Sequence, residues 1–207
     1  MGSIVKEFTW YPADLRPRFY QLRADWTYMT EAERQQPEFQ CPKRWFPKKD
    51  WQRTKKQKIF GLTTSTGKQL SFLIPKPWDT PAWAKLVKEK VAPFLKKAFP
   101  NRSSYQILLD GEKILHGRVA KDAFVEAGIT IFPGWPGYSP DLNPQENVWA
   151  WTEEEVRDDE EDSDSFVQFQ KRCLRAVRRY PYGKTLVGGM SKRMKTLVER
   201  EGRHIGK

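Results

Sequence analysis

The sequence predicts a mixed α/β fold, and two patterns support this prediction. Residues 105–110 form an apolar run that ends in an acid, and residues 129–132 form a second apolar run. An amphipathic helix is predicted over about 119–127, between the two runs, and Gly128 ends it. This order is typical of a βαβ unit, in which the two strands are parallel.

Upstream of this unit, the sequence predicts three more strands and a helix. Residues 19–25 are β-prone and predict a first strand that ends near Asp25. Residues 58–64 and 69–74 flank a short turn and predict an antiparallel hairpin. Over 80–95, apolar residues recur at helical spacing after a Thr-Pro start, which predicts an amphipathic helix.

The C-terminal third is predicted to be helical. Residues 143–156 predict a helix because an asparagine cap followed by proline in the first turn is a common helix start. Residues 166–179 and 185–199 predict two more helices within the C-terminal stretch 166–201. The acidic stretch over about 157–165 is expected to be a solvated loop between helices.

Composition sets the class of protein. The chain has 207 residues, of which 38% are hydrophobic and 14% aromatic, and this content predicts one domain over residues 1–207 with a buried core. No apolar run approaches the roughly 20 residues that span a bilayer, and the start of the chain lacks the apolar core of a secretory signal. We therefore expect a soluble, intracellular protein with no membrane partner. Cys41 and Cys173 lack a ligand-like spacing, which argues against a disulfide framework or a zinc finger.

The net charge of +11 suits a partner that carries phosphates. Between residues 43 and 58, basic side chains alternate with aromatic ones, which suits a surface that contacts phosphates and stacks on bases. A solvated basic face that keeps the protein soluble explains the charge equally well. If nucleic acid is the partner, the candidate contacts are Lys43, Arg44, Lys48, Lys49, Arg53, Lys55, Lys56, His116, Arg178 and Arg179.

Three acids occur where chemistry would need them. Asp25 ends the first predicted strand, Asp110 ends the fourth, and Glu146 lies at the start of a later helix. Carboxylates packed together repel one another, so a cation must hold such a cluster, and hard oxygen ligands select Mg²⁺ or Mn²⁺. Two ions about 3.5–4 Å apart can activate a water or a 3′-hydroxyl and stabilise the leaving oxygen of a phosphodiester. This chemistry needs no small-molecule cofactor.

The stretch around Glu146 carries a family resemblance. Residues 138–149 read Tyr-Ser-Pro-Asp-Leu-Asn-Pro-Gln-Glu-Asn-Val-Trp, which resembles the signature of mariner-superfamily DDE transposases, whose third catalytic acid is the glutamate. The strand that ends at Asp110 resembles the one with the family's second acid, and 35 residues separate Asp110 from Glu146, close to the family's short interval. Asp25 lies where the first aspartate is expected.

This resemblance implies a ribonuclease-H-like α/β domain, with a mixed sheet of about five strands flanked by helices. It also implies an endonuclease and transposase that cuts DNA and transfers strands with Mg²⁺ or Mn²⁺, two ions acting during catalysis, and Asp25, Asp110 and Glu146 as metal ligands. The resemblance further implies that DNA is the partner and that the protein lies in the nucleus if its host is a eukaryote. A homodimer is a possible assembly.

The sequence also departs from the family pattern. The family's second acid is usually followed by Asn, whereas Gly111 follows Asp110, and His116 is displaced by one position. The residues before Asp25 are too few for the family's paired helix-turn-helix domains, so sequence-specific recognition is expected to be weak or to come from elsewhere.

Alternatives therefore stay open. A domesticated or decayed module that binds DNA or protein without transposing is one, and a nuclease without strand transfer is another. Glu146 could instead belong to a capping box, and His116 could make a structural hydrogen bond rather than touch a phosphate.

Overall fold

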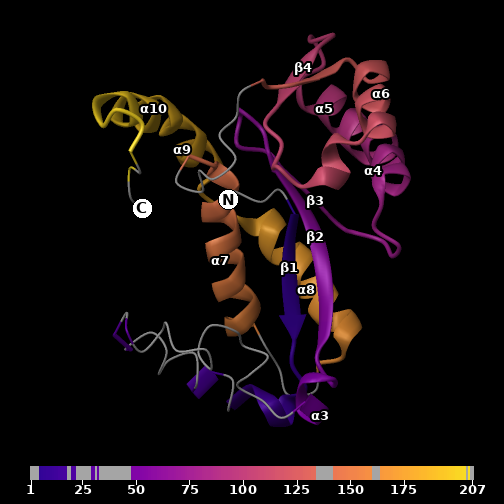
Figure 1. The fold of residues 1–207 in the computed structure, drawn as a ribbon, viewed down its shortest axis with the longest axis vertical. Coiled ribbons are helices and arrows are strands. Elements are labelled where there is room, and N and C mark those ends of the chain that lie inside the picture. Colours follow the sequence, from indigo (N-terminus) through magenta and orange to yellow (C-terminus); the bar gives the residue numbers. More distant parts are fainter. Residues whose placement is uncertain are drawn as a thin grey trace.

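The computed structural model describes residues 5–17, 20–21, 29–30, 32, 48–133, 142–159, 164–203 and 205. Within these ranges the protein is a mixed α/β fold with strands at its centre and helices around them (Figure 1). The strands form two hydrogen-bonded groups, in the orders β1-β2-β3 and β4-β5. The predicted mixed α/β fold with flanking helices is confirmed, and among the described residues its strands form two separate sheets of three and two strands. No helix in the described ranges is long and apolar enough to cross a membrane.

The first group of strands is antiparallel. β1 (Val5–Trp10) pairs with β2 (Lys55–Thr63), which pairs in turn with β3 (Gln69–Leu73). β2 and β3 form the predicted hairpin, and its turn is closed by a hydrogen bond of 2.9 Å from the Thr64 N–H to the Lys68 carbonyl. The hairpin is thus confirmed, with β2 starting earlier than its apolar residues indicated.

The first strand of the structure is not the predicted one. β1 lies upstream of residues 19–25, and Tyr20 and Gln21, which the prediction placed in a strand, are helical. The prediction is wrong for these two residues, and the rest of that stretch, apart from them, lies outside the described residues. β1 alternates apolar with polar residues only weakly, so its partner β2 determines its conformation.

The second group is the predicted βαβ unit. β4 (Tyr105–Ile107) runs parallel to β5 (Ile129–Ile131), and α6 (Arg118–Glu126) connects them. Gly128 follows α6 with a φ of 66°, a left-handed conformation that glycine adopts at little cost at the end of a helix.

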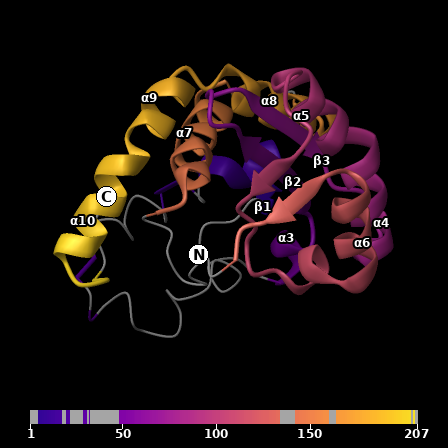
Figure 2. The ribbon, with the colours of Figure 1, turned by 90° about the horizontal axis from the view of Figure 1, so that it is seen from above.

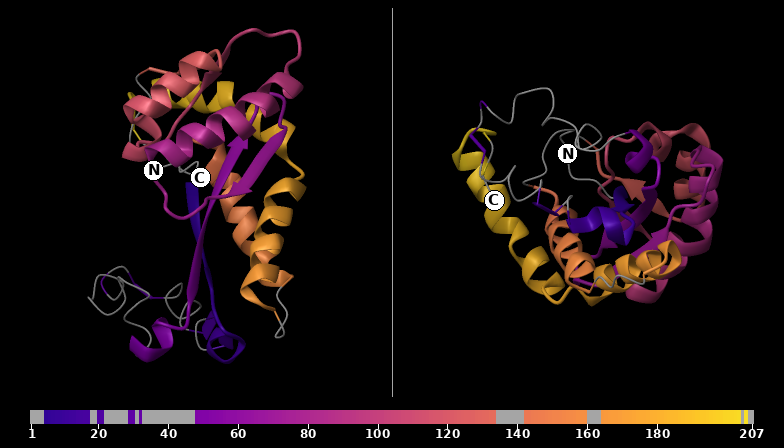
Figure 3. Two further views of the ribbon diagram at one scale, coloured as in Figure 1. Left: turned by 90° about the vertical axis from the view of Figure 1, so that its right-hand side faces the viewer. Right: turned by 90° about the horizontal axis from the view of Figure 1, so that it is seen from below.

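Two sets of helices cover the sheet, and β2 separates them. Ile59 of β2 packs in one apolar cluster with α7 (Pro144–Asp158) and α8 (Phe166–Arg179). Its neighbour Phe60 packs in another cluster with the helices that precede and follow β4. Because side chains alternate along a strand, the two sets lie on opposite faces, as Figure 2 and the left view of Figure 3 show.

The remaining elements are short or continuous with these. The predicted helix over 80–95 is one run of three parts, α4 (Thr80–Leu86), a π-helical segment η3 (Val87–Val91) and α5 (Ala92–Ala98). The predicted last helix over 185–199 is two helices, α9 (Gly183–Gly188) and α10 (Met190–Glu199), which are separated by the single residue Gly189. Short helices are η1 (Ala13–Leu15), α3 (Lys48–Trp51) and η4 (Lys113–His116).

Candidate active site

Asp110 lies three residues beyond the end of β4, and only 8% of its surface is exposed. Its Oδ1 accepts a hydrogen bond of 2.7 Å from the Gly111 N–H. Its backbone carbonyl lies 2.6 Å from Nε2 of His116. In the part of the chain that the structure describes, no basic side chain forms an ion pair with the Asp110 carboxylate. A buried carboxylate without a cationic partner is costly, so this site favours a bound cation.

Glu146 lies in the first turn of α7 and is half-buried. The sequence builds this helix start as predicted, because the Asn143 side chain accepts a hydrogen bond of 2.9 Å from the Gln145 N–H and Pro144 is the first helical residue. The Glu146 N–H donates to the Asn143 carbonyl at 3.2 Å. The cap thus fixes the backbone that carries the Glu146 carboxylate.

The start of α7 is anchored on β2. The Gln145 side chain is 3% exposed, and its Oε1 accepts a hydrogen bond of 2.9 Å from the Thr63 hydroxyl. Trp149, one turn later, is 1% exposed and contacts Phe8 of β1 edge to face, with ring centroids 6.0 Å apart. Both side chains lie against Gly61, where a Cβ would come within 2.4 Å of Trp149 and 2.7 Å of Gln145. The absence of a side chain at Gly61 therefore sets how closely α7 approaches the sheet.

One cavity connects the two segments that carry Asp110 and Glu146. Its volume is about 500 Å³, and its wall includes Leu108, two residues before Asp110, and Gln145, the residue before Glu146. The rest of the wall comes from β4 and the residues before it, the end of β2 and the turn after it, the end of α5, the first residues of α7 with their cap, and the α9–α10 region. The cavity thus lies between the segments that carry the second and third predicted acids, and its wall contains neither Asp110 nor Glu146.

Asp25, the first predicted acid, lies outside the described residues. Within the described ranges, no three His, Cys, Asp or Glu side chains come together as a metal site. β1 carries no aspartate, and its Lys6 forms an ion pair of 2.8 Å with Glu153 of α7. Its one acid, Glu7, binds Lys56.

The comparisons with known proteins identify the family. The model of a family described as "DDE superfamily endonuclease" matches residues 24–170, a span that contains Asp25, Asp110 and Glu146. The chain belongs to this family. Curated proteins gave no match.

The DDE endonuclease has the fold of a mariner transposase catalytic domain. It is similar to the crystal structure of the Mos1 mariner catalytic domain, with a TM-score of 0.58, 13% identity, and coverage of 73% of this chain and 77% of that one. For a Mos1 paired-end complex with the left transposon end, the TM-score is 0.61 and the identity 15%, and the match covers 73% of this chain and 45% of that one. For the Mos1 catalytic domain with raltegravir and Mn, the TM-score is 0.59 and the identity 15%, and the match covers 73% of this chain and 78% of that one. At these identities the likeness shows the fold, and the ribonuclease-H-like prediction is confirmed. Family and fold together do not favour the alternative of a module without activity.

Several DNA-contact candidates of this DDE endonuclease already have partners within the protein. Arg53 donates two hydrogen bonds of 2.7 Å to Asp14, and this guanidinium lowers the pKa of the Asp14 carboxyl. The Lys55 ammonium lies over the rings of Trp10 and Phe166, at 5.7 and 5.6 Å from their centroids. His116 binds the backbone of Asp110, as the structural alternative expected.

Other candidates remain more accessible. Three candidates are exposed: Lys49 on α3, and Arg178 and Arg179 on α8. Arg178 donates a long hydrogen bond of 3.4 Å to the Ser71 carbonyl, and the Arg179 guanidinium lies 3.9 Å from the Asp159 carboxylate. The backbone of Lys48 is in α3, and its side chain lies outside what the structure describes, as do Lys43 and Arg44 altogether.

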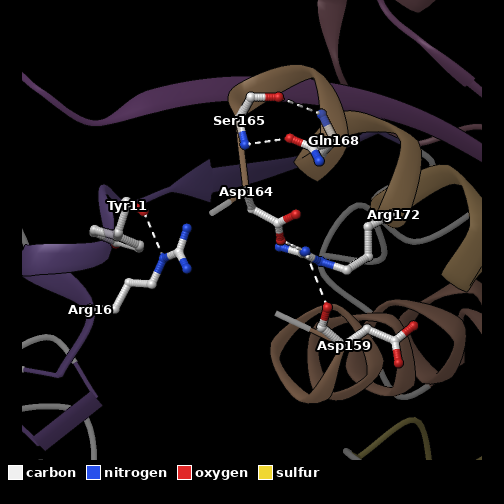
Figure 4. A network of polar contacts seen from close by, with 7 residues as sticks. All are labelled: Tyr11, Arg16, Asp159, Asp164, Ser165, Gln168 and Arg172. Atoms are coloured by element: carbon white, nitrogen blue, oxygen red, sulfur yellow. Dashed lines mark hydrogen bonds and ion pairs between the residues drawn. The ribbon is translucent and has the colours of Figure 1, made fainter. Parts of the chain in front are cut away.

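Arg172, at the start of the basic stretch of α8, is not a surface residue. Its guanidinium forms an ion pair with Asp164, and the two side chains are only 6% and 7% exposed (Figure 4). Arg172 also donates to the Asp159 carbonyl at 3.2 Å. The prediction of a solvated acidic loop is therefore wrong at Asp164, which is drawn inward because the buried Arg172 requires a counter-charge.

Three supporting residues of the DDE endonuclease were missed in the sequence. Gly61 and Gln145 dock α7, and Glu112 holds the loop after Asp110. A glycine inside a strand often marks a close approach of another segment, so Gly61 carried a usable signal. Gln145 and Glu112 have no such sequence signal, because their hydrogen-bond partners Thr63 and Trp78 are 82 and 34 residues away in sequence.

Proposed function

We propose that this DDE endonuclease cuts DNA at transposon ends and joins the freed ends to new DNA, with divalent metal held by Asp25, Asp110 and Glu146. The observation that carries the proposal is Asp110, which is 8% exposed and has no basic partner among the described residues. Its Oδ2 accepts no hydrogen bond from those residues and is suited to a cation.

The donor set fits Mg²⁺ or Mn²⁺, because carboxylate oxygens are the ligands that these hard cations prefer. When bound, the metal would supply an activated water or 3′-hydroxyl and stabilise the leaving oxygen. The chain's own part is to hold the ligands in place through the Asn143 cap at Glu146 and the His116 contact at Asp110. The related Mos1 catalytic domain has been described with Mn and with Mg, which supports this choice.

DNA at transposon ends is the proposed substrate. Mos1 transposase forms a paired-end complex with its left transposon end, and this chain shares that fold. The exposed Arg178 and Arg179 are proposed phosphate contacts. Replacing both with alanine should weaken binding nearly equally for all sequences and reduce the magnitude of the log–log salt slope by about 0.9 for each phosphate lost. A titration of labelled duplexes at several salt concentrations measures this slope.

A plasmid nicking and strand-transfer assay with Mg²⁺ or Mn²⁺ tests the chemistry. Asp110→Asn and Glu146→Gln should abolish both reactions, because each removes a metal-binding charge. Asp122→Asn is the matched control, since Asp122 is an exposed residue of α6 and the chemical change is the same. Nicking by Asp110→Asn at the wild-type rate would refute the proposed site.

The same assay separates the remaining alternatives. Nicking without strand transfer would identify a nuclease of this fold that does not transpose. DNA binding without any nicking, in wild type and variants alike, would identify a module that has lost its activity.

Asp25 is proposed as the first acid partly because a nearby competitor is occupied. Asp14 is bound at both carboxylate oxygens by Arg53, which leaves it poorly suited to ligate a metal. Asp25→Asn should therefore abolish nicking, while Asp14→Asn should leave it within about threefold of wild type, the effect of a surface ion pair being small. The reverse result would reassign the first ligand.

Assembly and location are proposed on the resemblance alone. We propose a homodimer that acts on paired DNA ends, and a nuclear location if the host is a eukaryote. Light scattering of the purified chain with and without DNA ends tests the first proposal, and the distribution of a fluorescent fusion tests the second.

A further inference from the structure

The carboxylate of Glu112, two residues after Asp110, is held by two donors from other elements. The Trp78 indole N–H donates to Oε1 of Glu112 at 2.9 Å. The Lys58 ammonium, from β2, lies 3.2 Å from the same oxygen. The Glu112 side chain is 25% exposed, so the pair with Lys58 is partly shielded from water. One oxygen atom thus ties the loop after Asp110 to β2 and to the segment before α4.

The rest of this loop is tied down beyond Glu112. The Thr80 hydroxyl, at the start of α4, donates to the Ile114 carbonyl at 3.3 Å. Leu115 is fully buried in the apolar cluster, and Nε2 of His116 closes the loop on the Asp110 carbonyl at 2.6 Å. The loop therefore has fixed points at its start, at Glu112, and at its end.

Gly111 is the weak point between Asp110 and Glu112. A Cβ at Gly111 would meet nothing within 4 Å, so the space beside this residue is open. Glycine has more backbone freedom than any other residue, and its N–H is the hydrogen-bond donor to the Asp110 carboxylate, so a change of backbone angle at Gly111 would turn that carboxylate. The anchor at Glu112, one residue later, removes this freedom.

We infer that Glu112 is a positioning residue that, through Trp78 and Lys58, holds the Asp110 carboxylate in the orientation needed to bind metal. The inference rests on the proposed function of Asp110. Glu112 acts as a hydrogen-bond acceptor and does not itself ligate the metal. Partners that orient a ligand typically change metal affinity or activity 10- to 100-fold when removed.

Two substitutions at Glu112 separate positioning from ligation. Glu112→Ala removes the acceptor and should raise the Mn²⁺ concentration for half-maximal nicking, and the Mn²⁺ dissociation constant, about 10- to 100-fold. Glu112→Gln keeps an acceptor oxygen for Trp78 and should stay within about threefold of wild type, because the acceptor is what orients the loop. Trp78→Phe removes only the N–H donor and should fall between the two.

The measurements use the full chain and include one that does not depend on turnover. Mn²⁺ binding is followed by electron paramagnetic resonance, nicking by plasmid assay, and folding by thermal melting. Glu126→Ala is the matched control, because Glu126 is an exposed acid of α6 that also pairs with a lysine, Lys88, at 2.5 Å. This control should bind Mn²⁺ and nick DNA as wild type does.

The outcomes that overturn the inference are specific. If Glu112→Ala and Trp78→Phe both bind Mn²⁺ as wild type does, the anchor has no role in metal binding. If Glu112→Gln is as impaired as Glu112→Ala, the Glu112 charge is required and the acceptor for Trp78 is not what orients the loop. If Asp110→Asn also binds Mn²⁺ and nicks DNA normally, the proposed function fails first, whatever Glu112 does. Should Glu112→Ala not fold, Trp78→Phe alone decides.

Discussion

Replacing Gly61 with alanine tests whether the docking of α7 on β2 places Glu146. The new Cβ would lie 2.4 Å from Cη2 of Trp149 and 2.7 Å from Nε2 of Gln145, far inside van der Waals contact. Neither neighbour can retreat easily, since Trp149 and Gln145 are 1% and 3% exposed. The start of α7 must therefore move away from the sheet, and Glu146 must move with it.

The expected cost follows from two opposing terms. Overpacking of a close-packed core costs about 1–3 kcal/mol. Alanine restricts the unfolded chain more than glycine does, which returns about 0.4–1 kcal/mol at a site with ordinary backbone angles. The net destabilisation is at most about 2.6 kcal/mol and about 1.3 kcal/mol from the middle of both ranges, or roughly 3–5 °C in melting temperature for a chain of this size. A shift of about 1 Å at a reacting group can lower the rate about 100-fold, so nicking should fall much more than stability does.

Urea unfolding and plasmid nicking of Gly61→Ala measure both effects, with DNA affinity as a third readout that should not change. Gly188→Ala is the matched control, because a Cβ there meets nothing within 4 Å and the site is helical, so alanine should be neutral or slightly stabilising. If Gly61→Ala unfolds and nicks as wild type does, the close approach at Gly61 does not position Glu146 and the reasoning is wrong.

Three more predictions concern the supports of the fold. Asp164→Ala should lower the free energy of unfolding, measured in urea, by about 3–5 kcal/mol, because it leaves the Arg172 charge buried without a partner. The double variant Asp164→Leu with Arg172→Met should recover most of this loss, because it removes both charges. Asn143→Ala should cost about 0.5–2 kcal/mol in the same assay and lower nicking, since the cap orients the start of α7. Arg53 lowers the pKa of Asp14 below its ordinary value, so the stabilisation from this pair is present above that ordinary value and is lost as the pH falls through the lower folded value. A carboxyl NMR titration should show that the Asp14 pKa rises in Arg53→Met.

The sequence by itself determined those elements whose signals are local. α8 is found at the predicted residues because Ser165 and Gln168 form a capping box at its start and apolar residues recur every turn after it. Asn143 and Pro144 fixed the start of α7, and Gly128 fixed the end of α6. The family signature around Glu146 is likewise a contiguous run of residues, so it was readable without a structure.

Only the tertiary structure decided what depends on distant partners. β1 is a strand because β2 supplies its hydrogen bonds, whereas its own six residues give a weak signal. Arg172 is a buried ion-pair partner because Asp164 folds back onto it. Gln145 and Glu112 serve the site through contacts across β2 and the segment before α4. Such contacts join residues that are far apart in sequence. Core packing and the pairing of buried charges bring these residues together, and no local sequence pattern encodes either effect.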